Sequence, residues 1–352
     1  MLVVAPTPPI IGGQTVQAAH LIEAFRNESW LQADIQSINP SLFPRLQRIK
    51  YVRTVLTSIR YLADLFLRIP EYDIIHVFSA SYFSFLLAPT PAVLISKLFG
   101  KRTILNYHSG EARDHLTRWR HTAIPTIKLF DAVVTPSGYL VDVFKDFGLS
   151  ARAICNFVDT DRFQFRERNN LQPVFLSNRN FEAHYNVSCC LRAFSRIQQE
   201  LPQARLIVVG DGPEKEKLQL LAKDLQLQHT EFLGRISPDR MPMIYDKADV
   251  YLNTPSVDNM PISILEAFAC GLPVISTNTG GIPYIVENGK TGLLVEDNDY
   301  CGLADAALLL FEDTGLAARL AAAARIEVSK YSWQNVRKGW QQSYSELVAE
   351  KI

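Results

Sequence analysis

Two carboxylates flank the start of a short predicted helix in the second half of the chain. Asp258 precedes the helix and Glu266 lies eight positions later. The helix is predicted over residues 262–270, because Pro261 suits a first helical position. The free N–H groups of its first turn, beginning at Ile262, and the positive end of its dipole would bind phosphate. The sequence therefore predicts an anion site framed by two acidic side chains.

The elements around this helix alternate between short apolar strands, glycine-rich turns and helices. A buried strand is expected at 272–276, and Gly280 and Gly281 follow it. Glycines there would let a second backbone segment approach the same ligand without a Cβ in the way. The same alternation along the whole chain predicts parallel, doubly wound α/β sheets.

A second glycine pair, Gly12 and Gly13, separates an apolar strand at 1–6 from an amphipathic helix at 14–26. This arrangement points another helix N-terminus at an anion, although a tight turn without a ligand is the alternative. The strand begins almost at Met1, so we expect the natural start of the protein to lie a few residues upstream.

His108 follows a strand predicted at 102–107 and precedes a Ser-Gly loop. Ligands of open α/β sheets bind beyond the carboxyl ends of the strands, so His108 is a candidate site residue. The alternative is an ordinary histidine in a surface loop. His20 and His76 lack a following glycine-rich loop, and we expect both to be structural.

The composition favours two globular domains and a reducing compartment. The chain has 352 residues, 47% hydrophobic and 20% charged, and its 36 basic side chains balance 36 acidic ones. This balance argues against a nucleic-acid binder. Five cysteines without a C-x-x-C pair predict buried thiols rather than disulfides or a metal site. No signal peptide or apolar run of about twenty residues is present, which predicts a cytoplasmic protein.

The stretch 254–296 resembles the donor-site signature of the retaining glycosyltransferases of family 4. It has the acidic-x7-Glu spacing, then A-C-G-L-P-V-I, then a G-G tail ending in G-L-L-V. The resemblance implies the GT-B fold, two facing Rossmann-like domains with a cleft between them. It places an acceptor-side domain at 1–165, a nucleotide-sugar donor domain at 166–332, and a last helix at 333–352 that crosses back to the first domain.

The resemblance also implies roles for single residues. Arg179 and His184 would lie against the donor diphosphate, where the family has an arginine and a lysine. Asp258, in a place where the family usually has glutamate, would hold the donor sugar, and Glu266 the ribose hydroxyls. His108 would contact the sugar near the reacting centre. The other donor-binding residues implied are Gly12, Gly13, Gly210, Gly212, Ile236, Met260, Pro261 and Ile262.

The function that the resemblance implies is retaining transfer of a hexose from a UDP- or GDP-linked sugar to a glycan or lipid-linked acceptor, in cell-surface polysaccharide or glycoconjugate synthesis. Neither a cofactor nor a metal is expected, because fixed donors can stabilise the leaving diphosphate and no convincing D-x-D loop is present. The departures at His184, Asp258 and Phe157 leave open a non-catalytic nucleotide-sugar-binding scaffold. An NAD-dependent oxidoreductase is disfavoured because Lys215 occupies the third glycine position of G-x-G-x-x-G.

Residues 44–69 carry six basic side chains and one acid, with apolar residues at helical spacing. Such a basic amphipathic helix can lie on an anionic membrane, which would place the enzyme peripherally on the inner face of the cell membrane. The alternative is a helix that faces the core with solvated arginines.

Overall fold

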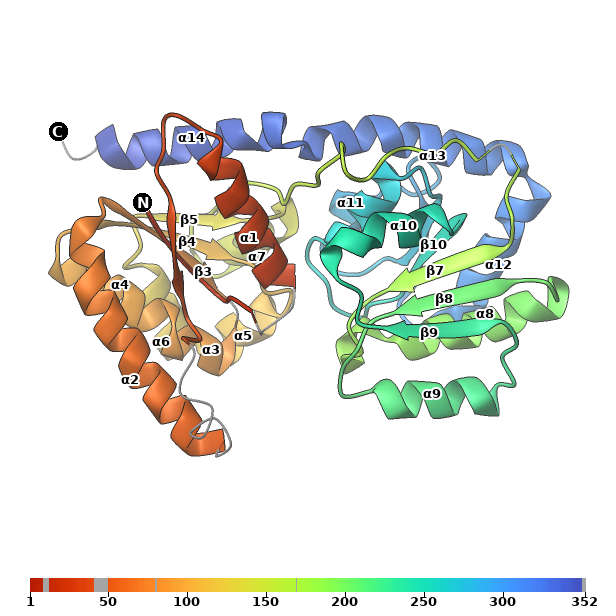
Figure 1. Ribbon diagram of the computed structural model, residues 1–352, viewed down its shortest axis with the longest axis horizontal. Helices are drawn as coiled ribbons and strands as arrows, with labels where there is room; N and C mark the ends of the chain where they lie inside the picture. Colours follow the sequence, from red (N-terminus) through yellow and green to blue (C-terminus); the bar gives the residue numbers. More distant parts are fainter. Residues whose placement is uncertain (9–12, 41–49, 80, 169, 350–352) are drawn as a thin grey trace. The chain divides into compact units, whose positions relative to one another are not determined.

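The computed structural model describes residues 1–8, 13–40, 50–79, 81–168 and 170–349. They form two compact units, Met1–Cys155 with Arg337–Ile352, and Asn156–Val336 (Figure 1). Gly12 and the start of the basic segment, residues 44–49, lie outside the described residues, and so do the side chains of residues 50–53.

The first unit is a six-stranded parallel sheet in the order β2-β1-β3-β4-β5-β6, with helices between successive strands. Its four inner strands are short, mainly apolar runs, and β3 is buried along its whole length, as expected for a sheet covered on both faces. The elements are β1 (Leu2–Ala5), α1 (Gly13–Arg26), β2 (Asp34–Ser37), α2 (Lys50–Arg68), β3 (Ile74–Ser79), α3 (Tyr82–Leu87), α4 (Pro89–Leu98), β4 (Arg102–Tyr107), α5 (Ala112–Arg118), α6 (Arg120–Ile127), β5 (Ala132–Thr135), α7 (Gly138–Asp146) and β6 (Arg152–Ala153).

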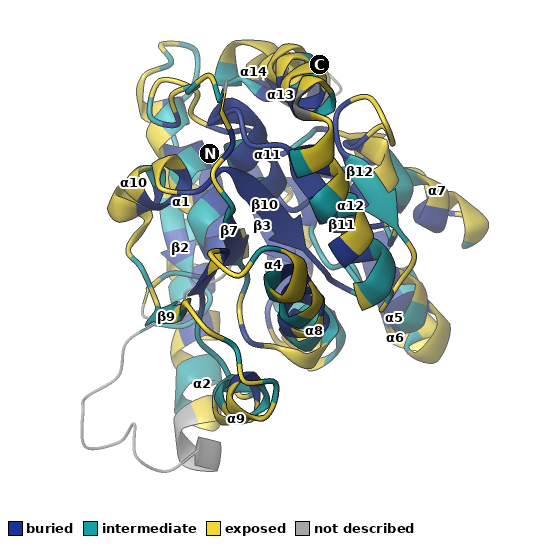
Figure 2. Ribbon diagram, turned by 90° about the vertical axis from the view of Figure 1, so that its right-hand side faces the viewer, coloured by how far each residue is buried: buried dark blue, intermediate teal, exposed yellow. Residues whose placement is uncertain are grey.

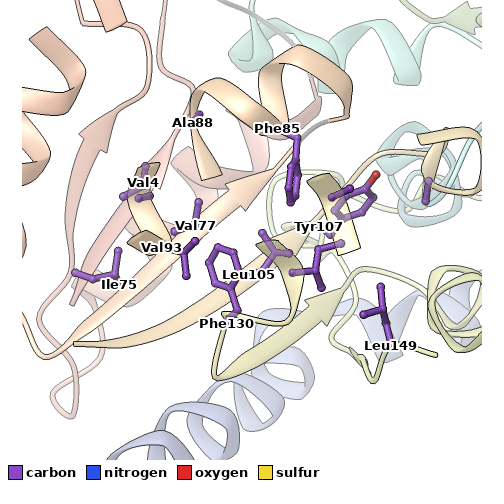
Figure 3. Close-up of a cluster of buried hydrophobic side chains, with 14 of the residues drawn as sticks. Val4, Ile75, Val77, Phe85, Ala88, Val93, Leu105, Tyr107, Phe130 and Leu149 are labelled. Atoms are coloured by element: carbon purple, nitrogen blue, oxygen red, sulfur yellow. The ribbon is translucent and has the colours of Figure 1, made fainter. Parts of the chain in front are cut away.

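The core of this unit lies between the strands and the helices on one face of the sheet. Val77 on β3 faces Val93 on α4, and the Phe130 ring lies beside Leu105 of β4 (Figure 3). All four side chains are buried. The strands β3 and β4 pair in register from Ile74–Arg102 to Ser79–Tyr107, so their carboxyl ends lie together.

The second unit repeats the architecture with the order β12-β11-β10-β7-β8-β9. Its strands β10 and β11 are buried, while the outer faces of α8, α9 and α12 are exposed (Figure 2). The elements are β7 (Val174–Asn178), α8 (Val187–Glu200), β8 (Arg205–Val209), α9 (Lys215–Asp224), β9 (Thr230–Gly234), α10 (Met241–Asp246), β10 (Val250–Asn253), α11 (Ile262–Ala269), β11 (Val274–Thr277), β12 (Leu293–Val295), α12 (Tyr300–Glu312) and α13 (Thr314–Val328).

The units divide at residues 155 and 336, where the sequence places boundaries at 165 and 332. Residues 156–165 belong to the second unit because their side chains pack there. The Asn156 amide donates to the Met260 carbonyl oxygen at 3.2 Å, and the Phe163 ring lies 5.7 Å from that of Tyr245. The last helix, α14 (Trp333–Ala349), begins in the second unit and continues into the first.

One local expectation was wrong in detail. Pro261 is the N-cap of α11, with ψ 115°, rather than its first helical residue. In the alanine-rich stretch 304–326, Asp313 ends α12 and its carboxylate caps α13 by accepting from the Leu316 N–H. Asp at an N-cap satisfies an orphan donor of the new helix.

The five cysteines are free thiols. No helix among the described residues is long and apolar enough to cross a membrane.

A buried arginine joins the start of the second unit to two of its helices. The Arg168 side chain is only 2% exposed, and its Nε lies 3.2 Å from the Asp249 carboxylate. It also donates to carbonyl oxygens of Tyr245 and Ala248, at the end of α10, and of Cys270, at the end of α11. Burial, then the nearby Arg166 guanidinium, lowers the pKa of Arg168 to about 10.

We expect Arg168→Ala to lower the free energy of unfolding by about 3 kcal/mol, because it strips buried carbonyls and Asp249 of a charged partner. Urea unfolding measures the loss. Arg196→Ala is the control, since Arg196 is 48% exposed in its pair with Asp305 and should cost less than about 1 kcal/mol. Equal losses for the two variants would show that the buried contacts of Arg168 stabilise the fold no more than an exposed ion pair does.

Candidate functional site

The predicted site residues divide between the two units. Gly13 and His108 lie in the first unit, and Arg179, His184, Gly210, Gly212, Ile236, Asp258, Met260, Pro261, Ile262 and Glu266 lie in the second. In the second unit the residues follow the carboxyl ends of β7, β8, β9 and β10. Parallel strands bring those ends to one edge of the sheet, which is where such sheets bind ligands.

Arg179, directly after β7, forms a buried ion pair with Asp258. Its Nη2 donates to the Asp258 carboxylate, and its Nη1 donates to Ser263 Oγ at 3.2 Å. The guanidinium carbon lies 4.0 Å from the centre of the Tyr185 ring. The Arg179 and Asp258 side chains are 8% and 12% exposed. Three fixed contacts therefore orient the guanidinium.

The pKa of Arg179 reflects two opposed effects. Burial alone would lower it, but the Asp258 carboxylate holds the pKa above its usual value. The Nε atom is buried and has no hydrogen-bond partner among the described residues. A buried charged donor without a partner is costly, so this N–H is suited to an incoming anionic ligand.

Gly210 and Gly212 hold the Arg179 loop in place. A Cβ on Gly210 would lie 2.0 Å from the Arg179 carbonyl oxygen, and one on Gly212 would lie 2.7 Å from that of Phe181. Backbone bonds join the same loops, from the Arg179 N–H to Val209 and from the Phe181 N–H to Asp211. The protein's own backbone thus occupies the space that these glycines leave open, and contact between them and a donor remains a prediction.

Gly280 and Gly281 do the same for the loop before α11. An added Cβ would lie 2.0 Å from the Asp258 carbonyl oxygen in one case and 1.8 Å from that of Asn259 in the other. The Gly281 N–H donates to the Asp258 carbonyl at 3.1 Å. The backbone of the Asp258 loop therefore occupies the space beside these glycines, and their approach to a ligand stays a prediction.

Glu266 lies one turn into α11 and faces Tyr245. The Tyr245 hydroxyl donates to Glu266 Oε2 at 2.7 Å and receives a bond from the Asn178 amide at 3.2 Å. Burial raises the pKa of Glu266 to about 7, against the opposing effects of Tyr245 and Arg162. A carboxyl group with a pKa near 7 is partly ionised at neutral pH. Once it has lost its proton, its oxygens can accept hydrogen bonds from ligand hydroxyls.

The N-terminus of α11 presents backbone rather than side chains. Met260 is buried and Pro261 is the N-cap. Because the helix begins at Ile262, the N–H groups of Ile262 and Ser263 have no helical partner four residues earlier. The Ser263 hydroxyl, in the same first turn, accepts from the Arg179 guanidinium. Anion binding by this helix end stays a prediction, with geometry that suits it.

His184 contacts neighbouring residues of this site through its backbone and its ring. Its carbonyl accepts from the Ser256 N–H at 2.8 Å, and its ring centre lies 4.2 Å from that of Tyr185. Ile236 follows β9 and is half-buried; the neighbouring Gly234 carbonyl accepts from the Gly210 N–H at 3.0 Å.

In the first unit, His108 lies at the carboxyl end of β4, as expected. Its N–H donates to the Ser79 carbonyl at 3.1 Å, and its ring stacks on Phe78 with centres 5.1 Å apart. Burial lowers the pKa of His108 to about 3, so the imidazole is neutral at pH 7, and its buried Nε2 has no hydrogen-bond partner among the described residues. Gly13 begins α1 with open space around its Cα.

Tyr185 and Tyr245 lie in the site but were not predicted from the sequence, and for Ser263 only the backbone N–H was predicted to take part. The position of Ser263 in the first turn of the predicted helix was the one available signal. The contacts of the two tyrosines depend on the order of strands in the sheet, which local sequence does not contain. Within the parts of the chain that the structure describes, no three His, Cys, Asp or Glu side chains are grouped to hold a metal ion.

Comparison with known proteins assigns the family. Residues 11–162 match the sequence model for Glycosyltransferase Family 4, and residues 158–327 match that for Glycosyl transferases group 1. The chain belongs to glycosyltransferase family 4. This family 4 protein is 35% identical over 165 residues to a D-inositol 3-phosphate glycosyltransferase of Corynebacterium jeikeium, covering 45% of this chain and 39% of the relative.

A further relative is the N-acetyl-alpha-D-glucosaminyl L-malate synthase of Bacillus anthracis, 31% identical over 187 residues, covering 50% of this chain and 48% of the relative. These matches span less than half the length of either relative.

Two solved structures share the fold of the family 4 protein over nearly its whole length. Anabaena Alr3699/HepE in complex with UDP-glucose superposes with a TM-score of 0.80 at 17% identity, covering 98% of this chain and 99% of that one. The sucrose-phosphate synthase of Thermosynechococcus elongatus superposes with a TM-score of 0.79 at 18% identity, covering 99% of both chains. The two-domain α/β architecture is therefore the GT-B fold, as predicted.

The raised pKa of Glu266 predicts a pH-dependent stability difference. The folded state holds this proton up to about pH 7, whereas the unfolded chain releases it near the usual glutamate pKa of 4.5, so wild-type stability falls as the pH rises between them. The Glu266→Gln side chain cannot ionise. Between pH 5 and pH 8 the free energy of unfolding of this variant should therefore rise relative to that of the wild type, by at most about 3 kcal/mol.

Urea unfolding at a series of pH values measures the difference. The control is Glu287→Gln, an exposed carboxylate paired with Lys290, whose curve should run parallel to that of the wild type. A parallel curve for Glu266→Gln as well would show that Glu266 ionises normally in the fold.

Proposed function

We propose that this protein transfers a hexose from a UDP- or GDP-linked sugar to a glycan or lipid-linked acceptor, with retention at the anomeric carbon. The pathway that we propose is cell-surface polysaccharide or glycoconjugate synthesis, on the inner face of the cell membrane. Structures of the Anabaena neighbour hold UDP-glucose or UDP, and a Mycolicibacterium smegmatis relative is a GDP-mannose-dependent mannosyltransferase, which supports a nucleotide-sugar donor.

The observation that carries the proposal is the buried Nε of Arg179, which has no partner on a guanidinium otherwise fixed by Asp258 and Ser263. The guanidinium that carries this N–H contacts Ser263 in the first turn of α11. Together they offer the leaving diphosphate a charge-assisted donor and helix-dipole donors from fixed directions. Fixed donors of this kind need no reorganisation as charge develops on the leaving group.

The remaining roles follow from position. Glu266 would accept hydrogen bonds from the ribose hydroxyls. Asp258 would contact the sugar with Oδ1, which Arg179 does not bind and which already accepts from the Asn259 N–H at 2.8 Å. His108, a neutral imidazole with an unpartnered Nε2, would contact the sugar near the reacting carbon. An oxygen of the leaving phosphate would take the proton of the acceptor hydroxyl, so that no metal and no protein base is required.

A non-catalytic nucleotide-sugar-binding scaffold is the second candidate. Asp258 already neutralises Arg179, and His184 stands where the family has a lysine, so the site offers the diphosphate less positive charge. The scaffold would bind a nucleotide sugar without hydrolysing or transferring it. An assay of donor turnover therefore separates the two candidates.

Thermal stabilisation by UDP, GDP, ADP and their sugars should identify the donor. A ligand present at a hundred times its dissociation constant adds about 2.7 kcal/mol to the stability of the native state. We expect one nucleotide sugar to raise the melting temperature of the wild type, and Arg179→Lys, which loses the planar fork, to lose most of the shift.

Arg196→Lys, at an exposed ion pair on α8, is the control that should keep the shift. Absence of a shift with every nucleotide would overturn the donor site, and binding without turnover would favour the scaffold.

Attachment to an anionic membrane is the second part of the proposal, and the described part of α2 supports it. Val55, Ile59, Phe66 and Leu67 are 58%, 58%, 47% and 73% exposed. The Phe66 ring contacts Phe99 at the end of α4, which extends the apolar surface to a second helix. An exposed apolar face of this kind marks an interaction site.

Charge favours a lipid surface over a neutral partner. The first unit has 19 lysines and arginines against 13 acidic residues, whereas the second has 17 against 23. A positive unit that carries an exposed apolar helix suits an anionic bilayer, where basic side chains and buried apolar area act together.

Sedimentation with phosphatidylglycerol vesicles tests the attachment. We expect the wild type to pellet at low salt and less at high salt, and the double variant Ile59→Asp, Leu67→Asp to stay in solution. Leu220→Asp, with a side chain that is 58% exposed on α9 of the second unit, is the matched control and should pellet. Failure of the wild type to pellet at low salt would refute membrane attachment.

A further inference from the structure

A column of aromatic rings runs from the last helix to His108 inside the first unit. Trp340 and Tyr344 of α14 pack on His76 of β3, His76 stacks on Phe78, and Phe78 stacks on His108. The centres of successive rings lie between 5.0 and 6.0 Å apart. The column links a segment more than two hundred residues away in sequence to a candidate site residue.

The far end of the column is fixed by a buried hydrogen bond. His76 Nδ1 and the Tyr344 hydroxyl are 2.6 Å apart, and both side chains are almost inaccessible to solvent. Burial lowers the pKa of His76 to about 3, so its ring is neutral. Rings that are buried and hydrogen-bonded in this way have few alternative rotamers.

At the near end of the column, Phe78 is the one aromatic ring among the described residues that packs on His108. The His76 and Phe78 planes differ by 6°, and the Phe78 and His108 planes by 18°. The backbone of His108 is tied to Ser79 by its N–H, but no hydrogen bond to its Nε2 is present among the described residues. Stacking on Phe78 is therefore what sets the plane of the His108 ring.

We propose that Phe78 positions the His108 ring, and that α14 supports this arrangement through its contact with His76. The orientation of the unpartnered Nε2 then depends on a stack rather than on a hydrogen bond. The consequence for catalysis rests on the proposed function, in which His108 contacts the donor sugar. A ring that rotates out of this plane would still allow donor binding but would misplace the contact at the reacting carbon.

The test compares Phe78→Leu with the wild type by NMR of histidine-labelled full-length protein. The His108 signals are assigned by their loss in His108→Gln. We expect Phe78→Leu to shift and broaden the His108 ring signals, because the adjacent ring current and the stacking surface are removed. In turnover assays we expect kcat to fall about tenfold with little change in the donor KM, as for a misplaced reacting group.

Phe130→Leu is the matched control, because it removes the same atoms from a buried ring in the same unit. Among the described residues Phe130 stacks on neither histidine. It should leave the His108 signals and kcat unchanged. Tyr344→Phe keeps every ring and removes only the hydroxyl on His76, so it should shift His76 strongly and His108 weakly. This milder variant keeps the test valid if Phe78→Leu does not fold.

The proposal is overturned if Phe78→Leu leaves the His108 signals in place, if Phe130→Leu moves them equally, or if they move while kcat stays constant. Should the wild type turn over no donor at all, the proposed function fails. The NMR comparison then still decides whether Phe78 orients His108.

Discussion

The ion pair between Arg179 and Asp258 is the constraint on which the second unit's site depends. A buried charge without a partner is destabilising, and breaking such a pair typically costs about 3–5 kcal/mol. Both loops must therefore be held where the two charges meet. Glycines on each side permit this, because Gly210 allows close approach of the Arg179 backbone and Gly280 allows that of Asp258. The glycine turns thus hold the two charged loops in position.

Much of the fold could be predicted because its signals are local. Short apolar strands alternate with helices, and the eight-residue spacing from Asp258 to Glu266 spans a loop and one helix. The contact between Arg179 and Asp258 could not be read in this way, since it joins residues 79 positions apart. It exists because β10 lies next to β7 in the sheet, so that both loops leave the same edge. Strand order is a property of the whole unit, and it also brings Tyr245 to Glu266.

The same limit explains what was predicted of the first unit. The place of His108 after a strand indicated a site residue, and a missing glycine loop marked His76 as structural. What His76 supports could not be inferred, because its partner Tyr344 lies 268 residues away on a helix that returns from the second unit. A structural residue can therefore still matter for a site when an uninterrupted stack connects the two.

Buried charges and solvent-exposed charges in this protein should respond differently to salt. In the second unit the positive charge of Arg179 is already balanced by Asp258. A diphosphate at the proposed donor site would therefore meet mainly oriented dipoles at α11 and the Arg179 Nε–H, which has no partner among the described residues. Salt screens such short, buried contacts poorly. The first unit has an excess of positive charge in its sequence. A Debye length of about 8 Å at physiological salt weakens the attraction of exposed charges to a surface. Rising salt would therefore release the protein from a membrane at a lower concentration than the one at which it released a bound donor.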